Sequence, residues 1–516
     1  MDAKTAIAGV QYLVLLQACS RIATFVLNVL VVRHVSASVI GVANLQLVFL
    51  YQTSLFLVRE ACRRTCARRV SLTAGDAIAR RNITAVCTLA GVAVVAGLNR
   101  VFRMLSTSEE LSVDGYLTAC DITSVAVLIE LLAEPFYNYL QAGMEYGRRV
   151  AVEAGALLLR CVVLYALVRG LGMGLLAFPA AQLVHSVALL GFHAASFMCL
   201  PIARTDPPLS PWEFILPPLG HSLSVDREDR LLLFQFTWQS VEKVILAQGE
   251  TIVLKYFQVL AEQASFAVVT NLGSLVIRFL FQPIEEVSFN LFSRLCHDGR
   301  RDPARPGSSA RELRTAAGML SICIKIMLWV GLVFICFGTR YSFLLMDLLY
   351  GGKFRDSDGP DVLAAYCLFV AAAGLNGVTE SFVHAASDRS SMADHNRMLL
   401  VFSAINVATS VALVGPLGTG GIILSNSLVM TIRIAHSAHY IGRYMSTTRT
   451  PLPLSDCLPT LPVLASFGLS HAGIAVFQTV VPTSSFFSYA AVAQIAVGCL
   501  AFLATIGVTL ISEKEF

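Results

Sequence analysis

Long apolar stretches alternate with short polar segments along the whole chain. A membrane-spanning helix needs about 20 mainly apolar residues, and fourteen segments meet that requirement. They are 8–33, 37–58, 83–104, 116–141, 149–169, 173–200, 232–258, 264–292, 315–338, 361–386, 396–414, 418–441, 457–480 and 486–511. The pattern predicts an all-α integral membrane protein with about fourteen transmembrane helices.

A proline-rich stretch at 201–230 divides these segments into six and eight. Such composition makes a chain extended and semi-rigid, so we interpret the stretch as a cytosolic linker. We therefore predict an N-terminal six-helix lobe in 1–200 and a C-terminal six-helix lobe in 231–442. Two additional C-terminal helices would occupy 443–516.

The two lobes share short sequence matches. Asn44-Leu45 precedes Arg59 by the same distance as Asn271-Leu272 precedes Glu286, and Glu134-Pro135-Phe136 parallels Glu380-Ser381-Phe382. If these matches reflect a repeat, the lobes are pseudo-symmetric bundles around a central cleft, as in transporters built from repeats.

One predicted helix carries polar residues along a single face. Asn271, Ser274, Arg278, Gln282 and Glu285 recur at spacings of three and four, which places them on one side of an α-helix. A cation at the centre of a membrane helix costs about 2.5 to 3.5 kcal/mol on insertion scales. Arg278 should therefore face a wet interior or a partner, as is typical of transporters.

Similar polar stripes mark the other helices that begin each lobe. They comprise Gln17, Arg21, Thr24 and Asn28 in the first segment, Asn44, Gln52 and Arg59 in the second, and Gln235, Gln239 and Glu242 with nearby Lys243 in the seventh. The planar guanidinium of arginine forms paired hydrogen bonds with phosphate. These stripes therefore predict a cavity that binds an anionic head group.

The fourth helix of each lobe is acidic instead. Glu130 and Glu134 form a stripe in the first lobe, and Glu380 has the corresponding place in the second. Such carboxylates either take up protons or form structural pairs with neighbouring helices. Pro135 and Pro283 lie inside predicted helices, where proline favours a kink.

Charge supports the membrane assignment and indicates an orientation. Only 14% of residues are charged and 56% are hydrophobic, whereas soluble domains have about 25% charged residues. Basic residues gather in the even-numbered loops, which the positive-inside rule places in the cytosol together with both termini. No phosphate-binding loop, dinucleotide motif or metal-ligand cluster occurs. We therefore expect neither an enzyme nor a resident cofactor or metal.

Several stretches resemble the Rft family, the eukaryotic oligosaccharide-translocation family of the endoplasmic reticulum. They include RIATFVLNVLVVRHVSASVIGVANLQLVFLYQTSLFLVREACRR at 21–64, NLGSLVIRFLFQPIEEVSFNLFSRL at 271–295, and GPDVLAAYCLFVAAAGLNGVTESFVHAAS at 359–387. The resemblance implies the fold of the multidrug/oligosaccharidyl-lipid/polysaccharide exporter superfamily. Its motifs imply importance for Arg21, Arg33, Arg59, Arg63, Arg278, Glu285, Glu286 and Glu380.

The resemblance also implies a function in N-glycosylation. The substrate would be dolichyl-diphosphate-linked oligosaccharide, moved from the cytosolic to the lumenal leaflet of the endoplasmic reticulum membrane. The substrate-binding candidates are Arg21, Arg33, Asn44, Arg59, Arg63, Lys243, Asn271, Arg278 and Gln282, and the candidates for coupling or structural pairs are Glu130, Glu134, Glu285, Glu286 and Glu380.

Two alternatives remain. The protein would be a non-transporting factor that holds or delivers the lipid-linked oligosaccharide, possible partners being the glycosylation machinery. Fold analogy alone suggests an ion-coupled exporter of small cations, but the cationic stripes argue against it. Membrane lipids, and no nucleic acid, are the other expected contacts.

Overall fold

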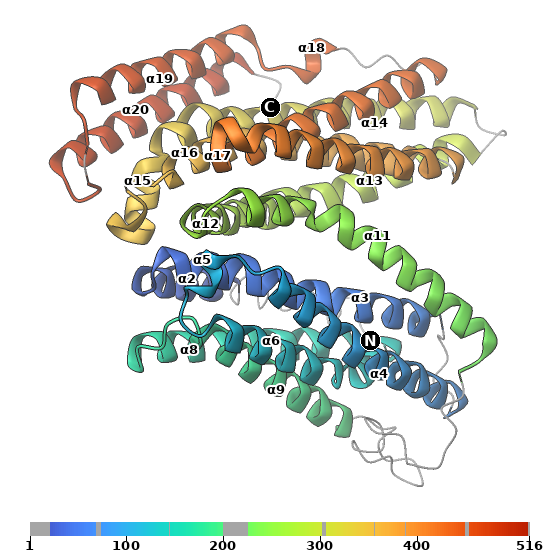
Figure 1. Cartoon of the computed structure of the whole chain (residues 1–516). Helices are drawn as coiled ribbons and strands as arrows, with labels where there is room; N and C mark the ends of the chain where they lie inside the picture. Colours follow the sequence, from blue (N-terminus) through green and yellow to red (C-terminus); the bar gives the residue numbers. More distant parts are fainter. Residues whose placement is uncertain are drawn as a thin grey trace, which may run out of the picture. The chain divides into compact units, whose positions relative to one another are not determined.

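The computed structural model describes residues 21–68, 74–143, 145–199, 225–301, 306–355, 357–387, 389–448, 454–483 and 485–513 (Figure 1). Within these ranges the chain is helical and contains no β-strand. It divides into two compact units, the first comprising Met1–Thr251 and Val259–Ala264 and the second Ile252–Gln258 and Ser265–Phe516. The predicted lobe boundaries at 200, 230 and 442 stay a prediction, and most of the linker lies outside the described residues.

Unit 1 contains the helices of the first half. After a helix at 21–34 come α2 (Ala37–Gly41), η1 (Val42–Leu47), α3 (Val48–Ala67), α4 (Ala74–Met104), α5 (Ser108–Leu111), α6 (Tyr116–Leu131), α7 (Glu134–Ala142), α8 (Tyr146–Gly170), α9 (Ala177–Met198) and most of α11 (Arg227–Phe257). Helix α3 packs on α4 and α6, and α9 packs on α6 and α8. Buried Leu55, Val58 and Val127 belong to the apolar core between α3, α4 and α6.

Unit 2 contains the second half. Its elements are most of α12 (Leu260–Val276), η3 (Ile277–Phe281), α13 (Gln282–Arg301), α14 (Pro306–Val333), η4 (Phe334–Gly338), α15 (Thr339–Tyr350), η5 (Gly351–Phe354), α16 (Gly359–Ala386), α17 (Arg389–Thr447), α18 (Leu454–Cys457), α19 (Leu461–Val480) and α20 (Tyr489–Ser512). Helix α16 is central, because it packs against α13, α14 and α17. Helices α19 and α20 form an antiparallel pair joined by a short connection (Figure 1).

The first turn of α12 belongs to unit 1 because polar contacts attach it there. The side-chain amide of Gln46 in η1 donates to the Gln263 side-chain carbonyl at 2.9 Å. The Leu260 backbone N–H donates to the Glu109 carboxylate at 3.0 Å. Both bonds satisfy polar groups where the helix begins.

Eleven helices among the described residues are long and apolar enough to cross a membrane. Ten coincide with one predicted segment each, and the eleventh, within α17, contains both 396–414 and 418–441, divided where Gly418 adopts φ 57°. Segment 232–258 lies in α11, which is helical but not among the eleven, and the first half of segment 8–33 lies outside the described residues. The protein is therefore a multi-pass, all-helical membrane protein, and the number fourteen stays a prediction.

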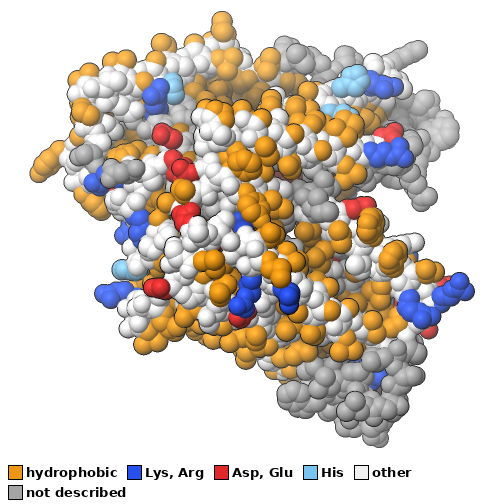
Figure 2. Space-filling model, viewed as in Figure 1, with side chains coloured by type: hydrophobic (Ala, Val, Ile, Leu, Met, Phe, Trp, Pro, Cys, Tyr) orange, Lys and Arg blue, Asp and Glu red, His pale blue; other side chains and the backbone are white. Residues whose placement is uncertain are grey.

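The outer surface fits a lipid environment. Leu500, Leu503 and Leu510 on α20 are between 63% and 72% exposed, and hydrophobic side chains are spread over the visible face (Figure 2). Exposed apolar area of this extent is costly in water but is stable against lipid.

Two helix irregularities fall on the candidate stripes. Helix α6 ends at Leu131 and α7 begins at Glu134 with Pro135 in its first turn, so the helix is interrupted where a kink was predicted. The π-helical turn η3 at Ile277–Phe281 lies directly before Pro283. Because a π turn adds a residue to one turn, it interrupts the α-helical spacing from which one continuous face was predicted for 271–285.

Candidate functional site

The strongest polar cluster of unit 1 joins α3 to the α6–α7 break. Arg59 places Nη2 2.5 Å from Glu130 Oε1 and Nε 2.6 Å from Glu134 Oε1. Arg63 donates from Nε and Nη2 to the two Glu134 oxygens, both at 2.8 Å. Two buried carboxylates therefore neutralise two arginines, which removes most of the penalty for placing these charges inside a membrane protein.

Neighbouring side chains complete the cluster. The Tyr51 hydroxyl donates to Glu130 Oε2, and the Ser186 hydroxyl lies 3.5 Å from the same oxygen. The guanidinium carbon of Arg63 lies 3.4 Å from the centroid of the Tyr137 ring, a favourable cation–π contact. Arg149 donates to the Tyr137 hydroxyl at 3.3 Å. The arginine side chains are therefore held in fixed positions.

A cavity of about 410 Å³ opens beside this cluster. Its polar lining consists of Arg59, Arg63, Glu130, Glu134, Tyr137, Glu153, His185 and His193. Arginine and histidine can bind oxyanions, whereas carboxylates and the tyrosine ring are common partners of sugar hydroxyls and sugar rings. The cavity thus offers both kinds of contact within membrane-spanning helices.

Unit 2 has a related cluster around Glu380 on α16. Arg433 Nη2 lies 2.9 Å and 2.6 Å from the two carboxylate oxygens. His395 Nε2 lies 3.0 Å from one oxygen, and the Asn376 amide donates to the other at 2.9 Å. Because the other three side chains all contact Glu380, the cluster ties α16 to both halves of α17, before and after its kink at Gly418.

Glu380, His384 and His395 are also the one described group whose donor atoms could hold a metal ion, since these atoms lie within 4.8 Å of one another. His384 and His395 stack edge to face at 4.8 Å between ring centroids. Arg433 already neutralises the carboxylate, however, so a divalent cation there would add uncompensated charge inside the membrane. The ion-pair network accounts for these residues without a metal.

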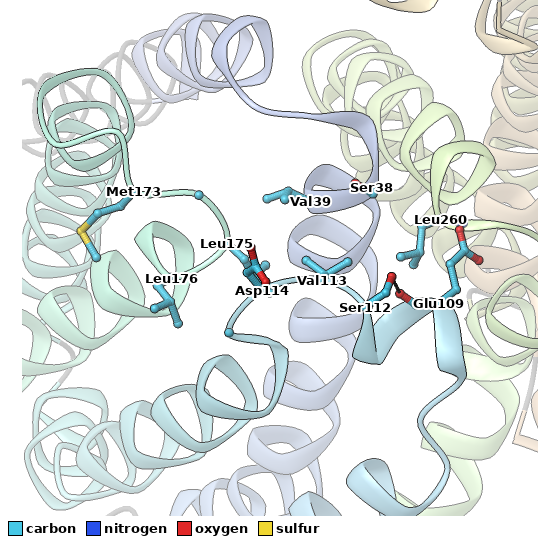
Figure 3. A pocket seen from close by; sticks show the side chains of 12 residues that line it. Ser38, Val39, Glu109, Ser112, Val113, Asp114, Met173, Leu175, Leu176 and Leu260 are labelled. Carbon is cyan, nitrogen blue, oxygen red and sulfur yellow. Dashed lines mark hydrogen bonds between the residues drawn. The ribbon is translucent and has the colours of Figure 1, made fainter.

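A second cavity in unit 1, of about 590 Å³, differs in charge (Figure 3). It lies where α2, the α5–α6 region, the α8–α9 loop and the start of α12 meet, and Glu109 and Asp114 are its charged lining residues. Glu109 is committed to the Leu260 backbone, and its carbonyl accepts from the Ser112 hydroxyl at 2.6 Å. With no cation in its lining, this cavity is unsuited to phosphate.

The predicted residues of unit 1 fall into two groups. Arg59, Arg63, Glu130 and Glu134 lie together in one cluster, as described above. Arg21, Arg33 and Asn44 are not in the lining of its cavity, and Lys243 is exposed, 3.6 Å from Glu60. The predicted stripe of the seventh segment thus contacts the end of α3, through Lys243 and through a 3.3 Å bond from Arg64 to Gln239.

In unit 2 the structure brings together the acidic candidates Glu285 and Glu380. The Ser381 hydroxyl donates to the Glu285 backbone carbonyl at 3.4 Å, and the Glu285 carboxylate packs so closely on Gly377 that a Cβ there would lie 1.8 Å from it. The other candidates lie apart from this contact: Arg278, Gln282 and Glu286 are exposed, and Asn271 is half-buried.

Sequence reasoning missed several residues of these clusters. Tyr51, His185 and His193 gave no signal, because single polar residues on apolar helices are common. Arg433 lies in the predicted segment 418–441 but was not among the candidates. Arg160, within GALLLRCVVLYALV at 155–168, was the detectable omission, because an arginine in such an apolar run is costly.

Solved structures with the same fold define the class. The chain aligns with a structure titled "Lipid II flippase MurJ, inward closed conformation" at a TM-score of 0.63 and 16% identity, covering 97% of this chain and 98% of that one. It aligns with an inward-facing multidrug resistance MATE family transporter of the MOP superfamily at a TM-score of 0.58 and 14% identity, covering 83% and 96%. The protein thus has the fold of the MOP-type transporters.

Sequence comparison then gives the family. The family model described as Rft protein matches residues 5–516, so the chain belongs to the Rft family. Relatives named "Man(5)GlcNAc(2)-PP-dolichol translocation protein RFT1" include those of Xenopus tropicalis, 31% identical with 98% of this chain and 94% of that protein covered, and Dictyostelium discoideum, 32% identical with 82% and 84% covered. The Mus musculus relative is 31% identical, with 97% and 93% covered. The predicted family membership is confirmed.

Proposed function

We propose that this protein translocates Man5GlcNAc2-PP-dolichol from the cytosolic to the lumenal leaflet of the endoplasmic reticulum membrane, in support of N-glycosylation. The observation that carries the proposal is the similarity to relatives named for this translocation, which extends over 82% to 98% of the chain. A polar cavity within membrane-spanning helices of unit 1 offers contacts for part of such a head group.

The proposal includes a topology. The chain would cross the membrane fourteen times, as two six-helix lobes and two further helices, with both termini in the cytosol. The basic loops support this orientation through the positive-inside rule. The protein would act as a transporter without catalysis, and partners in the glycosylation machinery would supply and consume its substrate.

The ion pairs of unit 1 suggest how a head group would bind. Arg59 and Arg63 are already paired with Glu130 and Glu134, so a diphosphate would have to share these arginines or displace a carboxylate. Protonation of a displaced carboxylate would lower the cost of that exchange. The carboxylates would then neutralise the arginines whenever the negatively charged substrate is not bound.

A second candidate function is that of a non-transporting factor that holds or delivers the lipid-linked oligosaccharide. The observation that favours it is the pairing of Arg59 and Arg63 with Glu130 and Glu134. Arginines that are already neutralised by carboxylates bind a transported anion less strongly. Both candidates use the same substrate and membrane, so they differ only in whether the head group crosses.

The test is reconstitution of the purified chain in lipid vesicles with measurement of the sidedness of the oligosaccharide head group. Translocation should exceed that of protein-free vesicles, and equal rates would favour the factor. Arg278→Glu, at an exposed membrane arginine, should abolish function, because it reverses the charge offered to a diphosphate. Arg397→Glu, on an exposed arginine near the start of α17, is the matched control. Near-normal glycosylation in cells expressing Arg278→Glu at normal levels would contradict the role of Arg278.

A further inference from the structure

Arg160 is an unpaired cation within a membrane-spanning helix. It lies near the middle of the Gly147–Gly170 span of α8, and its Nε is buried without a hydrogen-bond partner. Its guanidinium forms no hydrogen bond or ion pair with any described residue. Arg59, Arg63 and Arg433 differ, since each has a carboxylate within 2.9 Å.

The surroundings of Arg160 provide more unused hydrogen-bonding groups. A cavity of about 110 Å³ is lined by Arg160, Tyr51, Gln52, Thr123 and Gln182. The side-chain amides of Gln52 and Gln182 have no hydrogen bond among the described residues. The cavity therefore combines one guanidinium with two amides, which are all available to an oxygen-rich ligand.

The nearby acidic group is not free to neutralise Arg160. Tyr51 interacts electrostatically with both Glu130 and Arg160, but the Glu130 oxygens are already occupied by the Tyr51 hydroxyl and by Arg59. If Glu130 paired with Arg160 instead of Arg59, Arg59 would lose that partner and the cluster would keep the same excess positive charge. Unit 1 thus retains one positive charge beyond those that the carboxylates of this cluster balance.

A phosphate group would remove this imbalance. The guanidinium fork matches two phosphate oxygens, and neutral amides can donate to a third. The cavity has room for several waters, given about 30 Å³ for each in the liquid, and hence for one tetrahedral oxyanion. Because the cavity lies among α3, α6, α8 and α9, within membrane-spanning helices, a lipid-borne phosphate is better placed to enter than a free ion.

From this arrangement we infer that the cavity of Arg160, Gln52 and Gln182 binds one phosphate group of the isoprenyl diphosphate, next to the Arg59–Glu134 cluster. The inference rests on the proposed function, which supplies the substrate class. It assigns Arg160 as a binding residue for phosphate. Arg59 and Arg63, which are paired with carboxylates, lie in a separate cluster of the same unit.

The experiment measures binding of farnesyl diphosphate, a soluble isoprenyl diphosphate, to the full-length protein in detergent. Arg160→Gln should weaken binding about 10- to 100-fold, as expected for a lost charge-assisted hydrogen bond. Arg160→Lys should lose less, because it keeps the charge without the fork. Arg169→Gln, which removes an exposed arginine at the end of the same helix, should leave binding unchanged.

Thermal stability without ligand separates binding from folding. Removal of an unpaired intramembrane charge should leave the melting temperature of Arg160→Gln equal to or above that of the parent protein. A clear fall would make Arg160 a structural residue and overturn the assignment. Equal farnesyl diphosphate binding by the parent and Arg160→Gln would overturn it too.

Two further measurements show whether the bound phosphate belongs to a lipid or to a free anion, and whether binding is independent of transport. Inorganic pyrophosphate should bind at least about tenfold more weakly than farnesyl diphosphate, since it lacks the lipid contribution. Equal binding would contradict a lipid-borne ligand and indicate a free-anion site. Absence of head-group translocation by the parent protein in vesicles would defeat the proposed transport, whereas an Arg160-dependent diphosphate affinity in the same preparation would leave this inference standing.

Discussion

Both units bury a glutamate at the corresponding helix, but they neutralise it differently. In unit 1, Glu134 pairs with Arg59 and Arg63 from α3. In unit 2, Glu380 pairs with Arg433 and His395, which come from distant parts of α17. The two units therefore share the position of the buried acid without sharing the helix that supplies the counter-charge.

The short sequence matches between the two predicted lobes bear on this difference. The register that matches Asn44 with Asn271 also matches Arg59 with Glu286, so in that alignment unit 2 has an acid where unit 1 has its arginine. A buried carboxylate without a cation is unstable, and α17 supplies that cation instead. In both units the glutamate is therefore neutralised, but the arginine that neutralises it comes from a different helix.

The two clusters also differ in their surroundings. The unit 1 cluster lines a cavity of about 410 Å³, whereas the unit 2 cluster links α16 to both halves of the kinked α17. We therefore expect substitutions in the unit 1 cluster to affect both stability and function, and those in the Glu380 cluster of unit 2 to affect mainly stability.

The largest effect is expected for Glu134→Gln. It leaves Arg63 without its bidentate partner and removes one of two partners from Arg59, so unfolding should become easier by about 3 to 5 kcal/mol. The measurement is the midpoint of thermal or denaturant unfolding in detergent. Glu153→Gln, at a half-exposed carboxylate 3.8 Å from Arg149, is the control, and equal midpoints for the two variants would refute a central role for the Glu134 pairs.

Glu380→Gln should have a smaller effect, about 1 to 3 kcal/mol. The Glu380 side chain is 12% exposed, compared with 4% for Glu134, and its substitution removes a counter-charge from one arginine rather than from two. Adding Arg433→Met should recover part of the loss, because replacing a whole ion pair costs less than breaking it. A loss equal to that of Glu134→Gln, or no recovery in the double variant, would show that the two clusters are equivalent after all.

Two glycines extend the comparison to packing. A Cβ at Gly41 in unit 1 would lie 2.3 Å from the Leu260 carbonyl oxygen, so Gly41→Ala must shift backbone and should cost about 1 to 3 kcal/mol. At Gly377 in unit 2 the obstacle is the mobile end of the Glu285 side chain, and Gly377→Ala should cost less than about 1 kcal/mol. Gly468→Ala, with nothing within 4 Å, is the neutral control for both unfolding measurements. The reverse order of the first two variants would mean that Glu285 is held rigidly beside Glu380.

The smallest effect concerns an ion pair outside both clusters. Glu513 follows α20, accepts from the Thr460 backbone N–H at 2.9 Å and lies 3.0 Å from Lys325 Nζ. Burial acts to raise the pKa of Glu513, but these two partners outweigh it and hold the pKa below its ordinary value. A carboxylate of this kind stabilises the fold above its unfolded pKa, and the contribution disappears as pH falls through the lowered folded value.

The melting temperatures of the parent protein and Glu513→Gln should therefore differ by a few degrees or less at pH 7. They should converge as the solution is acidified below the ordinary range of a glutamate. A difference that stays constant between neutral and acidic pH would show that the charge of Glu513 does not contribute.

Much of the class and family could be read from the chain. The length of each apolar run is a local property, so twelve predicted segments coincide with helices that can span a membrane. The kink predicted at Pro135 was equally local, because it follows from the missing N–H and the ring of proline. The π turn at Ile277–Phe281 was not foreseen, since hydrophobic periodicity does not distinguish an inserted residue from an ordinary α-helical turn.

The state of each charge was decided by tertiary structure. The sequence identified Arg59, Arg63 and Glu134 as polar residues in apolar helices, but the pairs they form span 71 residues of sequence. Glu380 obtains Arg433 from 53 residues away, whereas Arg160 pairs with no carboxylate among the described residues. Which cations remain available for an anion depends on how helices rotate and pack against one another, and a linear pattern of polar and apolar positions contains no record of that geometry.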